Sequence, residues 1–114
     1  MATDKEIVEG LIGELRRGTV VLAVLSQLKE PQYGYSLVQR FTDKGMPIET
    51  NTLYPLLRRL EAQGLLRSVW ETDGAKPRKY YVRTAQGTDV YDRLKQKWNA
   101  TVKTIATLIH EEDE

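Results

Sequence analysis

Polar side chains suited to nucleic-acid contacts gather at the start of one amphipathic segment, residues 51–64. Leu53, Leu56, Leu57 and Leu60 occupy one face of the helix that this spacing predicts. A helix of this size fits the DNA major groove, where side chains near its N-terminus reach base edges and phosphates. Asn51 and Thr52 could hydrogen-bond there. Tyr54 could reach a phosphate with its hydroxyl, and Arg58 could serve a phosphate or a guanine edge.

The same side chains also have purely structural interpretations. Adjacent arginines such as Arg58 and Arg59 are typical of a solvated helix face, and we expect Arg59 to be plain surface. Tyr54 is either a phosphate contact or an aromatic packed between this helix and the hairpin that follows. For Tyr35 we favour packing.

A basic hairpin follows the helix. Residues 67–72 and 78–83 are rich in aromatic and β-branched side chains, and residues 73–77 between them have turn chemistry. Between Arg58 and Arg83 there are seven basic residues against three acids, so positive charge concentrates here although the whole chain carries only +1. The hairpin tip could lie along the DNA backbone or enter the minor groove, and both alternatives remain open. Its cations are Lys76, Arg78 and Lys79.

The aromatic residues of the hairpin differ in expected depth. We expect Trp70 to lie in the core. Tyr80 and Tyr81 alternate across a strand, so one should face the core and the other the surface or DNA.

Helices must hold this segment in place. Residues 5–28 predict two helices, or one bent near Gly18, and the second is apolar almost all round, as expected of a central helix. Another helix is predicted from about Tyr33 or Gly34 to Lys44, ended by Gly45. Ile48 should turn into the core, and the amphipathic helix should begin at Asn51 or Thr52.

A long helix is predicted from Ala85 to about Ile109, capped by Thr84. Its apolar seam exceeds what so small a domain can cover, so we expect a second copy of the chain to cover it. Trp98 could be an interface anchor, which we favour, or the border of a flat cavity for a planar, apolar effector, and both roles could hold together. The seam comprises Tyr91, Leu94, Trp98, Val102, Ile105 and Ile109.

Composition argues against an enzyme. The chain has 114 residues, no cysteine and one histidine, His110, beside an acidic tail, and its glycines are scattered singly. We therefore predict no catalytic residues, no metal site and no cofactor. No stretch approaches the roughly 18 apolar residues of a membrane span, and the N-terminus lacks the build of a secretory signal, so we expect no membrane partner and a cytoplasmic location.

The order of three helical regions, a hairpin and a long helix predicts a mainly α fold with a small β-hairpin: a winged helix-turn-helix plus a long C-terminal dimerisation helix. We divide it into a DNA-binding domain at 1–84, with an N-terminal helix at 4–15, and a dimerisation helix with acidic tail at 85–114. Specific runs resemble the PadR-like transcriptional regulators, in the short form with a single C-terminal helix. The matching runs are Arg17–Thr19, Tyr33–Leu37, Thr52–Glu61, Gly64–Leu66 and Pro77–Tyr81, leading to Thr84 and Gly87.

The resemblance covers roughly residues 16–109. It implies a homodimeric repressor that binds an operator of double-stranded DNA with imperfect two-fold symmetry and responds to a small-molecule ligand. It places the recognition role on Asn51, Thr52, Tyr54 and Arg58, and the wing role on the three hairpin-tip cations. The rival hypothesis is a winged-helix module that binds protein and has no operator.

Overall fold

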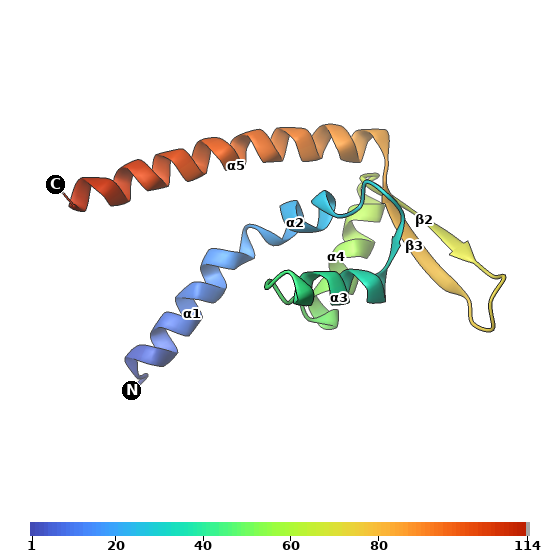
Figure 1. Cartoon of the computed structure of the whole chain (residues 1–114), viewed down its shortest axis with the longest axis horizontal. Helices are drawn as coiled ribbons and strands as arrows, with labels where there is room; N and C mark the ends of the chain where they lie inside the picture. Colours follow the sequence, from blue (N-terminus) through green and yellow to red (C-terminus); the bar gives the residue numbers. More distant parts are fainter. Residues whose placement is uncertain (114) are drawn as a thin grey trace.

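The computed structural model describes residues 1–113, which form five helices and a three-stranded antiparallel sheet (Figure 1). Glu114, the last residue of the predicted acidic tail, lies outside the described residues. The predicted order of helices, hairpin and long helix is confirmed. The elements are α1 (Asp4–Arg17), α2 (Val20–Ser26), β1 (Gln32–Tyr33), α3 (Gly34–Asp43), α4 (Thr50–Ala62), β2 (Leu66–Glu71), β3 (Arg78–Arg83) and α5 (Ala85–Glu112).

The first helical region is two helices rather than one bent helix. Thr3 caps α1 by accepting a hydrogen bond from the Glu6 amide at 3.2 Å. The chain leaves the helix at Gly18, and Thr19 then donates its hydroxyl to the Arg16 carbonyl at 2.7 Å. The following helix, α2, enters the centre of the fold as predicted.

The core is built around the leucine face of α4. Leu53 and Leu57 are fully buried and Leu60 is 1% exposed, so the four-residue stripe predicted from spacing is confirmed. The helices α2 and α3 and the sheet complete this core, and Ile48 turns into it as predicted. Its other buried members are Val24, Leu25, Leu28, Leu37, Phe41, Leu56, Leu65, Leu66 and Tyr81.

The predicted start of α4 was one or two residues late. The helix begins at Thr50, and Glu49 occupies the cap position in an extended conformation. The Glu49 carbonyl accepts from the Leu53 amide at 2.9 Å, and no side chain caps this end. A backbone carbonyl therefore sets the start, whereas the prediction assumed that a Thr or Asn side chain would do so.

The hairpin belongs to a sheet of three strands in the order β1-β3-β2. Strands β2 and β3 form the predicted hairpin, and residues 66–83 are called the wing from here on. The sequence did not predict β1, which pairs Gln32 with Tyr81 and Tyr33 with Tyr80. A two-residue strand has no periodic pattern of its own, so only its pairing with β3 defines it.

The prediction that Trp70 lies in the core was wrong. Trp70 is 60% exposed, although it pairs with Lys79 on the sheet face that also holds buried Tyr81. The wing extends beyond the helices (Figure 1). Leu66 and Tyr81 near its base belong to the core, whereas Trp70 lies farther along the hairpin toward its tip and is not part of the core. Tyr81 is 5% exposed and Tyr80 is half-buried on the other face, which confirms the predicted alternation of this pair.

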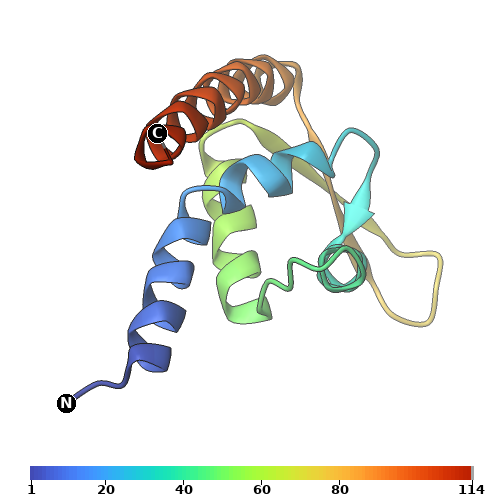
Figure 2. The same ribbon diagram turned by 60° about the vertical axis from the view of Figure 1, so that its left-hand side comes forward.

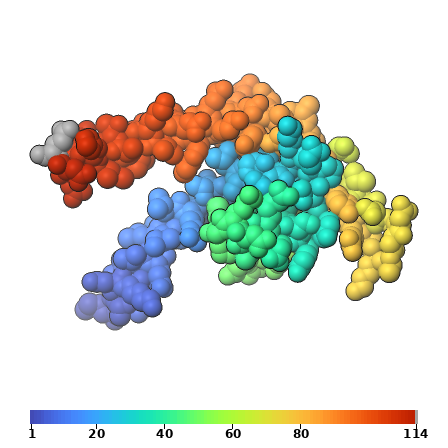
Figure 3. Space-filling model, in the orientation of Figure 1, coloured from blue at the N-terminus to red at the C-terminus, as the bar shows by residue number. Residues whose placement is uncertain are grey.

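Two helices project from the core as arms, a name kept here for α1 and α5 (Figure 3). Helix α1 has no buried residue, and Gly87 is the only buried one that α5 has among the residues described. Figures 1 and 2 show the arms leaving the same side of α2 and diverging toward the two termini. Most of their apolar side chains therefore have no covering element within one chain.

The joint between the core and α5 is closely packed. The Thr84 hydroxyl accepts from the Gly87 amide at 2.9 Å, as predicted for a cap, and donates to the Gly64 carbonyl at 2.7 Å. A β-carbon at Gly87 would overlap the Leu65 carbonyl group. Gly64 itself has a φ of +81°, the left-handed conformation expected where a helix ends. The start of α5 is thereby fixed against the end of α4.

Candidate nucleic-acid interface

The polar face of α4 is solvent-exposed from its first turn. Asn51, Thr52, Arg58 and Arg59 are all exposed, on the side opposite the buried leucines. The start of α4 and the tip of the wing extend away from α5 in both ribbon views (Figures 1 and 2). One side of the molecule thus presents the helix and the hairpin together, as a groove-binding surface requires.

Tyr54 packs against the beginning of α3. Gly34, the first residue of α3, is buried, and a β-carbon there would overlap the Tyr54 ring, with the Tyr54 hydroxyl oxygen at 2.9 Å. Tyr54 therefore packs as an aromatic, but against α3 and not between α4 and the hairpin as the structural alternative proposed. Tyr54 keeps partial exposure, so the predicted phosphate contact stays a prediction.

Arg78 is exposed, and an aromatic pair positions it. Its guanidinium carbon lies 5.2 Å from the centroid of the Tyr33 ring, which meets the Tyr80 ring edge-on at 5.3 Å. A hydrogen bond to Glu71 raises the pKa of the Tyr80 hydroxyl above its ordinary value of 10.0. The strand that sequence reasoning missed, β1, thus supplies the ring on which Arg78 rests, whereas Lys76 is simply exposed in the turn.

Lys79 points back toward α4 instead of outward with Arg78. Its ammonium lies 3.5 Å from a carboxylate oxygen of Glu61 and 5.2 Å from the Tyr81 ring centroid. Partial burial lowers the pKa of Lys79, but hydrogen bonding to Tyr81 and the nearby Glu61 carboxylate outweigh it and raise this pKa above its ordinary value of 10.5. The three predicted hairpin cations therefore differ in their surroundings, and their contacts with DNA stay predictions.

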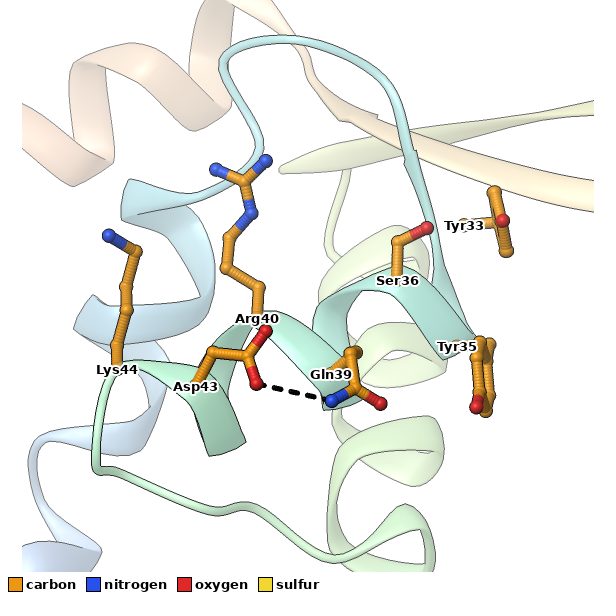
Figure 4. Close-up of a pocket in the computed structure, with 7 residues that line it drawn as sticks. All are labelled: Tyr33, Tyr35, Ser36, Gln39, Arg40, Asp43 and Lys44. Carbon is orange, nitrogen blue, oxygen red and sulfur yellow. Dashed lines mark hydrogen bonds between the residues drawn. The ribbon is translucent and has the colours of Figure 1, made fainter.

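The outer face of α3 carries an open groove of about 650 Å³, shown in Figure 4. Tyr35 points out from it and is 65% exposed, so the preference for packing at this position was wrong. Gln39 donates to Asp43 at 3.2 Å along the same face. Polar residues four apart opposite Leu37 and Phe41 are the signal that could have identified this face. The lining residues are Tyr33, Tyr35, Ser36, Gln39, Arg40, Asp43 and Lys44.

The predicted seam of α5 is exposed along its length. Leu94 and Trp98 are 37% and 43% exposed. Val102 and Ile105 continue the row at 44% and 47%. The structure places these four residues on one exposed helix face, and their roles in a dimer and in ligand binding stay predictions. Helix α1 adds a second exposed apolar row, consisting of Ile7, Val8, Leu11, Ile12 and Leu15.

Across residues 1–113, no three His, Asp or Glu side chains are grouped so that they could hold a metal ion. None of the helices in this range combines the length and apolar character needed to cross a membrane.

Comparison with known proteins agrees on one family. Residues 21–93 match the transcriptional regulator PadR-like family. A transcriptional regulator of Mycobacterium tuberculosis is 35% identical over 75 residues, which cover 65% of this chain and 70% of that protein. The crystal structure of a PadR family transcriptional regulator from Eggerthella lenta superposes with a TM-score of 0.88 at 51% identity, covering 92% of this chain and 94% of the other. A PadR-like transcription factor from Bacteroides fragilis has a TM-score of 0.73 at 30% identity, over 87% and 98%.

Proposed function

The chain belongs to the PadR-like family of transcriptional regulators, and from this premise we propose that it is a homodimeric repressor released from its operator by a small molecule. Regulators of this family bind DNA. The proposal adds the residues that make the contacts, the two-fold assembly and the effector. The observation that carries it is the exposed polar face of α4. Four buried leucines on the opposite face hold the helix against the core, and a wing with basic residues flanks it.

Helix α4 is the recognition helix in this proposal. Asn51 and Thr52 stand in its first turn, where side chains reach base edges in the major groove. Tyr54 directs its hydroxyl to a phosphate while its ring stays packed on α3, and Arg58 binds a phosphate or a guanine one turn later. Arg78, resting on Tyr33, and Lys76 then contact the neighbouring backbone from the wing.

The two arms supply the dimer interface. A stable interface needs an apolar patch that two identical surfaces can cover, and the rows on α1 and α5 are the long exposed apolar rows of the described chain. In a symmetric pair, the α5 seam of one copy meets the arms of the other. Each DNA-binding half then faces one half-site of a pseudo-palindromic operator.

The effector binds beside Trp98 in this proposal. Trp98 lies near the middle of the seam and is 43% exposed, so two copies could bring their indoles to either side of the dimer axis. A flat apolar space between two indoles suits a planar aromatic molecule, which stacks on them.

Selection of bound duplexes from a random DNA pool tests operator binding and geometry together. Half-sites separated by about 10 base pairs, or one helical turn, are expected for a two-fold dimer. Affinity for the selected duplex should fall roughly 10³-fold between about 50 and 200 mM salt. Arg58→Ala should weaken binding, whereas the neighbouring Arg59→Ala, the matched control, should leave it nearly unchanged. Equal binding of all duplexes together with tight capture of a protein partner would favour the rival interaction module.

Trp98 fluorescence tests the effector. The chain has two tryptophans, so Trp70→Phe leaves Trp98 as the sole indole reporter. A planar polycyclic aromatic dye should quench the emission of this variant and release the selected duplex. Leu108→Ala, farther along α5, serves as a control for general loosening of the helix. Quenching of equal size in a Trp98→Ala chain, which retains only Trp70, would show that the dye binds elsewhere.

A further inference from the structure

Three side chains from three elements meet between the recognition helix and the wing. Glu61, near the C-terminal end of α4, accepts a hydrogen bond from the Ser68 hydroxyl on β2 through one carboxylate oxygen. Its other oxygen lies 3.5 Å from the Lys79 ammonium on β3. These three residues are called the brace. They form a polar connection from α4 to both strands of the wing.

The surroundings of Lys79 favour its place in the brace over a place on DNA. Its ammonium also lies 5.9 Å from the Trp70 ring centroid, in addition to its contact with Tyr81. The side chains of Lys79 and Glu61 are 30% and 32% exposed, well below the exposure of the ion pair between Arg93 and Asp89 at 79% and 63%. The positive charge of Lys79 is therefore satisfied within the chain.

We propose that Glu61 is a positioning residue that sets the angle between the recognition helix and the wing, and that Lys79 acts on DNA only through the brace. The inference rests on the proposed DNA-binding function. The base of the wing shares the apolar core with α4 through Leu66 and Tyr81, and the rest of the wing extends past that core (Figure 1). The brace adds a polar connection to this packing, and a groove-binding surface needs helix and wing in one fixed relation. The brace supplies that relation, and Glu61 itself touches no nucleotide.

The direction in which DNA affinity changes when the Glu61 charge is removed distinguishes a positioning role from simple repulsion of the phosphates. A carboxylate close to DNA repels the phosphates, so its neutralisation alone strengthens binding to every duplex. Loss of the brace instead weakens binding to the operator and leaves non-specific binding equal or stronger, because only the operator requires both elements in register.

Glu61→Gln is the first test, because glutamine keeps an acceptor for Ser68 but loses the charge that faces Lys79. The probes are the duplex selected by the wild-type chain and a shuffled duplex of equal composition. The ratio of the two affinities should fall about tenfold, the size of one good base contact. Asp89→Asn, which removes the same charge from an exposed pair on α5, should leave the ratio unchanged. A ratio that stays at the wild-type value in Glu61→Gln would overturn the proposal.

A charge swap tests Lys79 without altering net charge. Lys79→Glu alone should lower the affinity ratio, and combining it with Glu61→Lys should restore the ratio to within about threefold of wild type, as paired residues do in a double-mutant cycle. If Lys79 contacted phosphate directly, the swapped chain would bind as poorly as Lys79→Glu alone. That result would reject the brace.

Hydrogen exchange tests the brace independently of any operator. Glu61→Gln should speed amide exchange in β2 and in the first half of β3, while exchange in α2 and at the centre of α4 stays at the wild-type rate. Unchanged exchange in the wing would show that Glu61 does not hold it. If the wild-type chain selects no duplex, the proposed function fails, and the exchange result still decides whether the brace holds the wing.

Discussion

The core and the arms bury similar apolar rows to very different extents. On α4, Leu53, Leu57 and Leu60 are between 0 and 1% exposed. On the arms, Leu11 is 57% exposed and Ile105 is 47% exposed. Both rows follow helical spacing, so periodicity identifies an apolar face without telling what covers it. A buried apolar face identifies the core, and an apolar face left exposed within one chain indicates a surface available for a partner.

The overall dimensions also show that the arms extend away from the core. The radius of gyration is 17.2 Å. A compact domain of this length has a radius of gyration of about 13 Å. The excess comes from the arms, which make the longest extent 60 Å. A chain with exposed apolar rows on two helices is suited to assembly with a second copy, as proposed above.

The largest expected effect is in the core. Leu57→Ala removes a fully buried side chain and should lower the free energy of unfolding by about 2–5 kcal/mol. Leu108→Ala, on an arm and 55% exposed, should cost much less in a dilute sample. Urea unfolding followed by circular dichroism measures both. Equal losses would abolish the contrast between core and arms.

Disruption of the arms should appear in assembly before it appears in folding. Ile105→Asp should raise the dimer dissociation constant at least about 100-fold, because two apolar side chains per dimer each lose about 1.5–3 kcal/mol of burial. Thr107→Asp introduces the same charge on the opposite helix face and should leave the dimer intact. Sedimentation at several concentrations separates the outcomes. A wild-type chain that sediments as a monomer at every concentration would contradict the proposed interface.

The joint between the two regions should give an intermediate effect. Thr84→Ala removes the cap of α5 and the hydrogen bond to Gly64, so the free energy of unfolding should fall by about 1–2 kcal/mol. Thr3→Ala removes the equivalent cap at the free end of α1 and should cost about 0.5 kcal/mol. Urea unfolding measures both variants. Equal losses of unfolding free energy in Thr84→Ala and Thr3→Ala would mean that the contacts at the joint add nothing to the stability that the cap alone provides.

The smallest effect belongs to the charged surface of α5. Asp89→Asn breaks an ion pair with Arg93 at 3.2 Å that is largely exposed to solvent. The change should alter the free energy of unfolding by no more than about 0.5 kcal/mol, and raising the salt concentration should reduce even that. A loss above 1 kcal/mol, measured by the same urea titration, would place Asp89 in an unrecognised contact.

Local pattern was enough for much of the fold. The leucine spacing located α4 and its buried face, and Thr84 identified the start of α5. These features depend on residues close together in the chain, where helical periodicity and capping act. The proposed contact residues of α4 follow from the same local rules, and their exposure is as expected.

Features that require distant residues could not be predicted in this way. The depth of Trp70 depends on where the covering helices end, and β1 exists only through its pairing with β3. The approach of Lys79 to Glu61 depends on how the hairpin folds back on α4. Periodicity assigns a side chain to a face of its own element but does not reveal how far the neighbouring element reaches.

The sequence by itself therefore determined the helices, the hairpin, the apolar faces and the family resemblance, because each arises from short-range spacing and residue type. Only the tertiary structure decided which faces are covered within one chain and which partners the hairpin cations have within it. Arg78 and Lys79 are adjacent in the sequence, yet strand alternation sends one to Tyr33 and the other to Glu61. Alternation within β3 accounts for their opposite faces, but the partner that each side chain meets there depends on the packing of β1, β3 and α4, which no local pattern contains.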